Sequence, residues 1–159
     1  MARTKGEKLI TDNRRARHDF HLLERHEAGL VLTGTEVKAL REGRATLGQA
    51  YVTIRGGEPW LVGAHISVYD HGNIQNHDPD RDRKLLLKAK EIRALDAKVS
   101  ERGLTLVPTR MYFKDGRAKV EIALARGKDV GDKRSDIARR EADRQIERVL
   151  KGRARDYDD

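Results

Sequence analysis

The sequence predicts a mainly β domain, a small antiparallel barrel or sandwich with helices packed outside it, followed by a charged tail. Two turns, at residues 55–58 and 115–116, contain glycine and lie between runs of strand-like apolar residues. Inside the domain, only two stretches have helical character. The last quarter of the chain carries many charges and too few large aliphatic residues to build a core.

The first third of the chain predicts an arm, strands and a short helix. Residues 1–16 are polar and basic, so we expect a loose N-terminal arm. Apolar positions typical of strands follow within residues 19–33. A short helix is expected to open after this stretch, at Gly34-Thr35-Glu36, with Thr35 as N-cap and Glu36 against the positive end of the helix dipole. Gly43 is expected to end it.

The middle of the chain predicts a hairpin and an exposed loop. Residues 51–54 and 60–62 are strand candidates, and Gly56-Gly57 between them suits a turn with positive φ. Residues 65–83 contain His-Gly-Asn and Asp-Pro-Asp sequences, which favour turns, so we expect a surface loop.

A second helix and a second hairpin complete the domain. Apolar residues at three-to-four spacing predict a helix from about Leu85 to Arg102, ended by Gly103. Residues 104–113 and 118–124 then predict two strands joined by Asp115-Gly116. The expected organisation is therefore an arm over residues 1–16, a barrel over 17–126 and a tail over 127–159.

Composition narrows the function. The 159 residues carry a formal charge of +8 and a pI near 9.9, which favours a nucleic-acid partner. There is no cysteine, which excludes disulfides, thiolate zinc sites and cysteine nucleophiles. No signal-peptide pattern and no apolar run of about 20 residues occurs, so we expect a soluble, cytoplasmic protein that does not enter a membrane.

The tail has an unusual charge pattern. Eleven basic and six acidic residues lie between Arg126 and Arg155. Read as a helix from about Asp132, the segment places six cations along one face. These are Lys133, Arg140, Arg144, Arg148, Lys151 and Arg155. Two interpretations stay open, a tail that is disordered when free and folds on a polyanion, and a solvated tail that only aids solubility.

Catalytic patterns are weak. Histidines and aspartates between His65 and Asp82 match no metal-ligand spacing, and Arg83 and Ala89 stand where a calcium loop requires glycine and glutamate. Residues 127–133 lack the Gly-Lys-Ser/Thr ending of a phosphate loop, and no serine lies in a nucleophile elbow. We expect no enzyme, no metal and no cofactor.

Cations outside the tail gather in three places, which suits recognition of the backbone and shape of structured RNA. The three clusters are Arg14, Arg15 and Arg17; Lys38, Arg41 and Arg44; and Arg81, Arg83, Lys84, Lys88 and Lys90.

Six segments, in order along almost the whole chain, resemble the SmpB (SsrA-binding protein) family of bacterial trans-translation. The matching segments are Asn13–His18, Glu27–Leu30, Gly34–Gly43, Arg83–Leu87, Gly127-Lys128 and Asp132–Arg134. The resemblance implies an OB-like β-barrel with flanking helices and a C-terminal tail that is disordered in the free protein. It also implies a monomeric adaptor without catalytic activity that binds the tRNA-like domain of tmRNA and delivers this RNA to stalled ribosomes.

The resemblance further implies partners and residue roles. The tail would become helical in the empty mRNA channel, against ribosomal RNA beyond the decoding centre. Elongation factor Tu and alanyl-tRNA synthetase would be indirect partners through tmRNA. Asn13, Glu27 and Leu86 match family positions associated with tmRNA binding, although a salt bridge by Glu27 and packing by Leu86 remain alternatives. Physical reasoning adds phosphate contacts by the basic neighbours. These are Arg14, Arg15, Arg17, Lys38, Arg41, Arg83 and Lys84.

In the tail, Asp132, Lys133 and Arg134 match the motif that the family uses on the ribosome, and Lys128, Arg140, Arg144 and Arg148 are expected to join them. This chain departs from the family at Asp129, where a second lysine is common, and at Gly131, where an aromatic residue or histidine is usual. Two other functions remain open, a general ribosome-associated RNA-binding protein and an RNA-processing hydrolase that uses His71 and Asp78.

Overall fold

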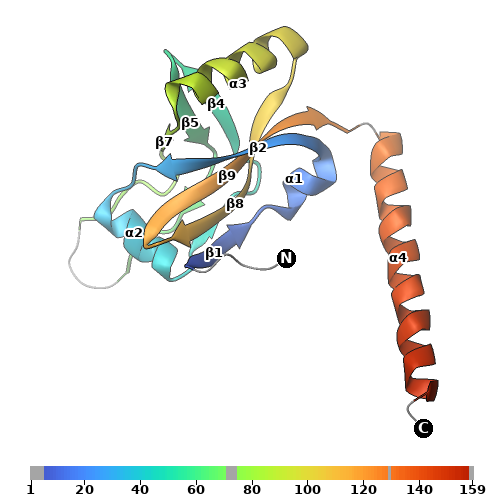
Figure 1. The fold of residues 1–159 in the computed structure, drawn as a ribbon. Helices are drawn as coiled ribbons and strands as arrows, with labels where there is room; N and C mark the ends of the chain where they lie inside the picture. The colour runs from blue at the N-terminus through green and yellow to red at the C-terminus, as the bar shows by residue number, and fades with distance from the viewer. Residues whose placement is uncertain (1–5, 71–74, 129, 158–159) are drawn as a thin grey trace. The chain divides into compact units, whose positions relative to one another are not determined.

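The computed structural model describes residues 6–70, 75–128 and 130–157 (Figure 1). The chain divides between Arg126 and Gly127 into two compact units. The first unit holds the strands and three helices, and the second holds helix α4, Val130–Tyr157. Among the described residues, no helix combines the length and the apolar character needed to cross a membrane.

The first unit consists mainly of strands, with three helices between them. Its helices are α1 Arg14–Asp19, α2 Gly34–Arg41 and α3 Ala89–Arg102. Its strands are β1 Glu7–Asp12, β2 Phe20–Leu30, β3 Ala45–Thr46, β4 Tyr51–Arg55, β5 Glu58–Val62, β6 His65–Ile66, β7 Arg83–Leu86, β8 Thr105–Lys114 and β9 Arg117–Gly127.

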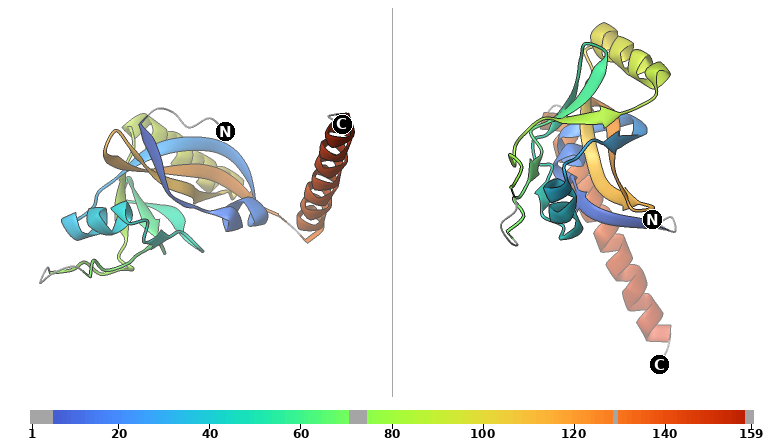
Figure 2. Two further views of the ribbon diagram at one scale, coloured as in Figure 1. Left: turned by 90° about the horizontal axis from the view of Figure 1, so that it is seen from below. Right: turned by 90° about the vertical axis from the view of Figure 1, so that its left-hand side faces the viewer.

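The main sheet closes on itself. Its strands pair in the order β8-β4-β5-β7-β2-β9, and β9 pairs again with β8. Strand β8 pairs with three strands, β9, β4 and β1. Strands β4 and β1 pair with different halves of β8: β4 pairs at Leu106, whereas β1 pairs further along, where Thr11 lies opposite Met111. The pairs along β8-β4-β5-β7-β2 and the pair β8–β9 are antiparallel. The predicted mainly β, OB-like barrel with flanking helices is therefore confirmed (Figures 1 and 2).

Both predicted hairpins are present, and local turn chemistry explains them. Gly56 and Gly57 have φ of 57° and 77°, and Asp115 and Gly116 have φ of 50° and 79°. Two successive residues with positive φ form the hairpin turn that matches the right-handed twist of paired strands.

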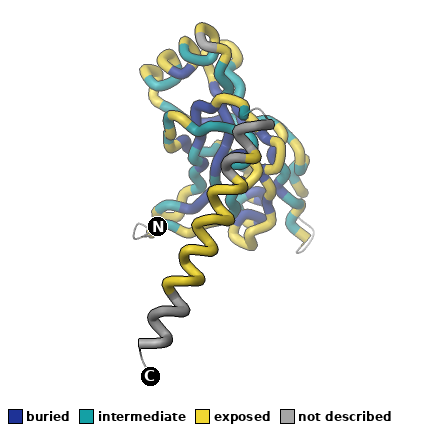
Figure 3. The backbone as a smooth tube through the Cα atoms, turned by 90° about the vertical axis from the view of Figure 1, so that its right-hand side faces the viewer, coloured by how far each residue is buried: buried dark blue, intermediate teal, exposed yellow. Residues whose placement is uncertain are grey.

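The core fills the barrel with aliphatic side chains. On β9, Val120, Ile122 and Leu124 alternate inward, and all are buried. Figure 3 shows buried backbone through the barrel, whereas every described side chain of α4 past Arg134 is exposed. The first unit thus has a core of its own.

The expected loose arm is wrong for residues 7–16, and residues 1–5 lie outside the described chain. Strand β1 pairs with β8, and α1 follows it directly. Asn13 caps α1, since its Oδ1 accepts from the backbone nitrogen of Ala16 at 3.2 Å. The next apolar stretch forms one long strand, β2.

Two predicted helix starts were also misplaced. The second helix begins at Ala89 rather than at Leu85, because residues 83–86 form β7 between β5 and β2. The N-cap of α2 is Thr33 rather than Thr35, and Thr33 and Glu36 form a reciprocal capping box. The loop after β5 also contains β6, which pairs with β3.

Candidate nucleic-acid interface

A charged surface surrounds Glu27 near the end of β2. The phenol oxygen of Tyr112 donates to Oε2 of Glu27 at 2.5 Å, and Lys114 Nζ lies 3.4 Å from the same oxygen. The Tyr112 hydrogen bond lowers the pKa of Glu27; burial opposes this shift, and Lys114 and Lys119 add to the lowering. Glu27 is therefore an exposed anion with a fixed orientation.

Leu86 lies beside Glu27 on the neighbouring strand. Residue 86 of β7 pairs with Gly29 of β2, and the Leu86 side chain is 56% exposed. A side chain at position 29 would place its Cβ only 3.3 Å from Leu86 Cβ. The glycine at this position therefore leaves space for the Leu86 side chain beside β2. The structure places Leu86 on the surface and not in the core.

Cations complete this surface. Two adjoining grooves meet at Glu27. One is lined also by Gly29, Leu86, Leu87, Lys88, Glu91 and Lys119, and the other by Lys114, Asp115, Arg117 and Lys119. Of the two further carboxylates, Glu91 already pairs with His26. We refer to eight residues of this surface as the Glu27 patch. It consists of Glu27, Gly29, Leu86, Lys88, Tyr112, Lys114, Arg117 and Lys119. An acceptor, an apolar contact and four cations on one surface suit RNA, whose phosphates need cations and whose hydroxyl and amino groups are donors.

Asn13 has a structural position. Its side chain is 4% exposed and, besides capping α1, donates to the carbonyl of Pro108 at 2.8 Å. Its backbone nitrogen also bonds Thr109 O. Asn13 therefore fixes α1, which carries Arg14 and Arg15, on β8, and a part in RNA binding would act through that helix.

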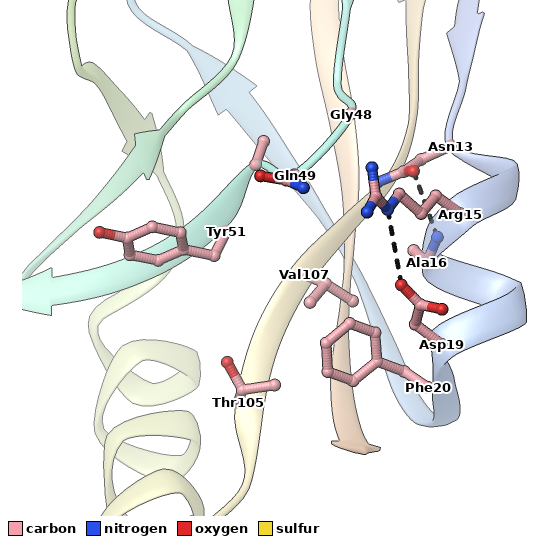
Figure 4. Close-up of a pocket in the computed structure, with 11 residues that line it drawn as sticks. Asn13, Arg15, Ala16, Asp19, Phe20, Gly48, Gln49, Tyr51, Thr105 and Val107 are labelled. Atoms are coloured by element: carbon pink, nitrogen blue, oxygen red, sulfur yellow. Dashed lines mark hydrogen bonds and ion pairs between the residues drawn. The ribbon is translucent and has the colours of Figure 1, made fainter. Parts of the chain in front are cut away.

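The α1 cations are exposed, but two of them already have partners. Arg17 binds Asp12 through both terminal nitrogens, at 2.6 and 3.0 Å, and Arg15 Nε lies 3.6 Å from Asp19. Arg15 borders a pocket between α1, β4 and β8 (Figure 4). Glu27 and Leu86 thus lie in the Glu27 patch, whereas Arg14, Arg15 and Arg17 lie on the surface of α1.

The expected phosphate contact by Arg83 is wrong. Arg83 is fully buried, and its Nε donates to Oε2 of Glu36 at 2.7 Å. Its terminal nitrogens donate to the carbonyls of Ala64 and Pro79. Since each of its three guanidinium nitrogens is hydrogen-bonded inside the protein, Arg83 holds α2 and the loop after β6 in place.

The other predicted cations are on the surface. Lys84 is half-exposed and lies 3.0 Å from Glu58, so an RNA phosphate would have to compete with that carboxylate. Lys38 is exposed over the ring of Tyr69, and Arg41 is exposed on α2. These three residues remain predicted contacts.

Of the six cations in the predicted stripe, three have described side chains; those of Lys133, Lys151 and Arg155 lie outside the described set. Arg140, Arg144 and Arg148 are exposed and follow each other at four-residue spacing. On the other side of the helix, small and apolar residues line a shallow hollow, namely Ala142, Gln145, Ile146, Val149 and Leu150. Arg134 is exposed and Lys128 partly buried, whereas the side chains of Asp132 and Lys133 lie outside the described set.

The histidine-rich loop has structural contacts where it is described. His77 bonds Thr35 Oγ1 through Nδ1 and the carbonyl of Ile66 through Nε2, both at 2.8 Å. His65 pairs with Asp80. Within the described chain, no cluster of three histidine or acidic side chains could hold a metal ion. His71, named for the hydrolase alternative, lies outside the described residues.

Sequence reasoning missed Tyr112, Lys114, Arg117 and Lys119. Alternation along β9 shows that Arg117 and Lys119 share a face, yet only the pairing of β9 with β2 and β8 brings them to Glu27. A closed barrel with a cation-rich patch, together with a basic helix, is typical of nucleic-acid-binding proteins.

Comparison with known proteins identifies the family. The family model described as SmpB protein matches residues 10–152, and the chain belongs to the SmpB family. The SsrA-binding protein of Desulforudis audaxviator is 55% identical over 154 residues, covering 97% of this chain and 100% of the relative. That of Thermobifida fusca is 60% identical over 148 residues, covering 93% and 92%.

A solved structure supports the same assignment. One similar chain belongs to the solved structure described as "tmRNA-SmpB: a journey to the center of the bacterial ribosome". It superposes on this protein with a TM-score of 0.64 and is 48% identical in sequence, and the match covers 76% of this chain and 85% of that one. The fold and the family therefore agree.

Proposed function

We propose that this protein is a non-catalytic adaptor that binds the tRNA-like domain of tmRNA and delivers this RNA to stalled ribosomes for trans-translation. The observation that carries the proposal is its 55% and 60% identity, over nearly full length, to SsrA-binding proteins. The adaptor works in the cytoplasm as a monomer, and it meets elongation factor Tu and alanyl-tRNA synthetase only through the RNA.

In this proposal the Glu27 patch binds tmRNA. Lys88, Lys114, Arg117 and Lys119 contact phosphates, while Leu86 packs on a ribose or base. Tyr112 and Lys114 both donate to Oε2 of Glu27, and Oε1 accepts from a ribose hydroxyl or a base amino group. Further phosphate contacts around the patch come from Arg14, Arg15, Lys38, Arg41 and Lys84. Arg17 adds another when its ion pair with Asp12 opens.

The tail acts on the ribosome. Helix α4 presents Arg140, Arg144 and Arg148 on one face, and this stripe contacts the phosphates of ribosomal RNA along the empty mRNA channel. Lys128 and the segment Asp132–Arg134 place the start of the helix at the decoding centre. At Gly131 no side chain is present to stack on a base.

The function is tested by sequencing the RNA that copurifies with the protein from its own cells at gentle salt. We expect one dominant species with a tRNA-like end. A broad mixture of ribosomal and other transcripts would instead support a general RNA-binding protein, and the tmRNA assignment would be abandoned.

Tyr112 is expected to support RNA binding through Glu27. The Tyr112→Phe substitution removes the hydroxyl that orients the Glu27 carboxylate, and a hydrogen bond of this kind contributes about 1 kcal/mol. We therefore expect roughly fivefold weaker binding of the tRNA-like domain, measured by filter binding.

A double-mutant cycle separates this effect from a loss of stability. In the Glu27→Gln background, Tyr112→Phe should change affinity much less, because the anion to be oriented is gone. Equal effects of Tyr112→Phe in both backgrounds would show that Tyr112 does not act through Glu27.

A further inference from the structure

A second concave site lies beside α1, away from the grooves of the Glu27 patch. It is a pocket of about 370 Å³ between α1, the start of β2, the segment before β4, and β8. Ala16, Phe20 and Val107 give it an apolar wall, where Phe20 packs on the small cluster formed by Ala16, Val107 and Ala125. Figure 4 shows the rings of Phe20 and Tyr51 on either side of Val107.

The rim of the pocket is polar. Arg15 lies there with a side chain 59% exposed, 3.6 Å from Asp19. The amide oxygen of Gln49, assigned toward Arg15 because the arginine nitrogens are donors, lies 3.1 and 3.3 Å from them. Asp19 and Gln49 therefore hold the Arg15 guanidinium at the mouth of the pocket (Figure 4).

These features select a neutral, flat group rather than an anion. Asp19 on the wall disfavours a phosphate inside the pocket, whereas Arg15 at the mouth favours one just outside. Unpaired RNA bases are commonly held against aromatic or apolar side chains, with their edges hydrogen-bonded by polar groups. The pocket volume is near the lower end of small-ligand sites, about 300–1,000 Å³, which suits one base.

We propose that this pocket accepts one unpaired nucleobase of an RNA ligand. Phe20 and Val107 pack against the base, Gln49 hydrogen-bonds its edge, and Arg15 binds the adjoining phosphate. The inference rests on the proposed function, because it requires RNA to be the partner. The base comes either from tmRNA or from ribosomal RNA, and the recognition chemistry is the same for both.

The test uses full-length protein with two probes, the tRNA-like domain of tmRNA and the small ribosomal subunit. Phe20→Leu keeps apolar volume against Ala16 and Val107 but removes the aromatic face. We expect roughly tenfold weaker binding to whichever probe supplies the base, as for the loss of one base–aromatic contact. Chemical probing should show one nucleotide whose base edge is protected by the native protein and reactive with the variant.

Two further variants make the test specific. Gln49→Ala changes an exposed segment, so the fold is preserved, and it should expose the same base edge. Phe113→Leu is the matched aromatic control in the barrel outside the pocket, and its protections should equal those of the native protein.

The proposal is overturned if Phe20→Leu and Gln49→Ala bind both probes with native affinity and native protections. In that outcome normal binding by the native protein would leave the adaptor function standing. If the native protein fails to bind either probe, the proposed function fails first and the base pocket falls with it.

Discussion

Deletion of the residues after Gly131 is expected to leave tmRNA affinity almost unchanged while abolishing the tagging of stalled nascent chains. The barrel closes and buries its core within residues up to 126, so it should fold without the tail. The Glu27 patch lies entirely in that unit. The lost segment carries Arg140, Arg144 and Arg148, which we propose contact ribosomal RNA. Binding assays and a reconstituted tagging reaction measure the two effects.

Charge variants of the tail provide the control. Replacing Arg140, Arg144 and Arg148 together with lysine keeps the cationic stripe and should retain most tagging, whereas replacement with glutamate should abolish it through repulsion from RNA phosphates. Loss of tmRNA binding on truncation would contradict the separation of roles. Full tagging by the truncated protein would remove the tail from the mechanism.

Substitution of Glu36 by glutamine is expected to destabilise the fold by about 3–5 kcal/mol, the range for removing one partner of a buried ion pair. Glu36 is fully buried and accepts from Arg83 Nε at 2.7 Å, from Arg81 Nε at 3.1 Å and from the backbone nitrogen of Thr33 at 2.9 Å. Glutamine fits the space but leaves the buried Arg83 cation without an anion. Urea denaturation followed by circular dichroism measures the loss.

Acid titration gives the same interaction a second readout. Burial alone raises the pKa of Glu36, but the bonds from Arg81, Thr33 and Arg83 overcome this and bring the pKa to about 2. Because the folded pKa is below the unfolded value of 4.5, this stabilisation is complete above about pH 5 and is lost as the pH falls toward 2.

Glu36→Gln should therefore flatten the acid limb of the stability curve, since the substituted side chain does not titrate. Glu42→Gln, at the exposed end of the same helix, is the matched control and should leave both stability and pH dependence nearly unchanged. An acid limb that keeps its native steepness in Glu36→Gln would show that other carboxylates dominate it.

Much of the fold could be predicted because its signals are local. The Gly56-Gly57 and Asp115-Gly116 turns are specified by residues that tolerate positive φ. The second helix ends at Gly103, which has the left-handed conformation expected of such a cap. The basic stripe of the tail follows from helical spacing alone, and α4 has that spacing.

The errors arose where long-range pairing overrides local preference. Leu85 continues a helical spacing, yet its segment is a strand because β5 and β2 supply hydrogen-bonding neighbours on both sides. The polar residues before Asn13 favour a loose arm by their local composition, yet they form a strand because they pair with β8, about a hundred positions later. Arg83 looked like a surface cation in a basic cluster, but Glu36 neutralises it inside the protein.

The β-rich barrel class and the basic tail follow from the sequence alone, and family resemblance adds Glu27 and Leu86. Turn geometry, helical periodicity and ordered motifs are properties of neighbouring residues, so they can be read along the chain. Only the tertiary structure decided which charges reach the surface and which residues surround Glu27. Tyr112 lies 85 positions from Glu27, and barrel closure, which no local pattern encodes, brings its hydroxyl to that carboxylate.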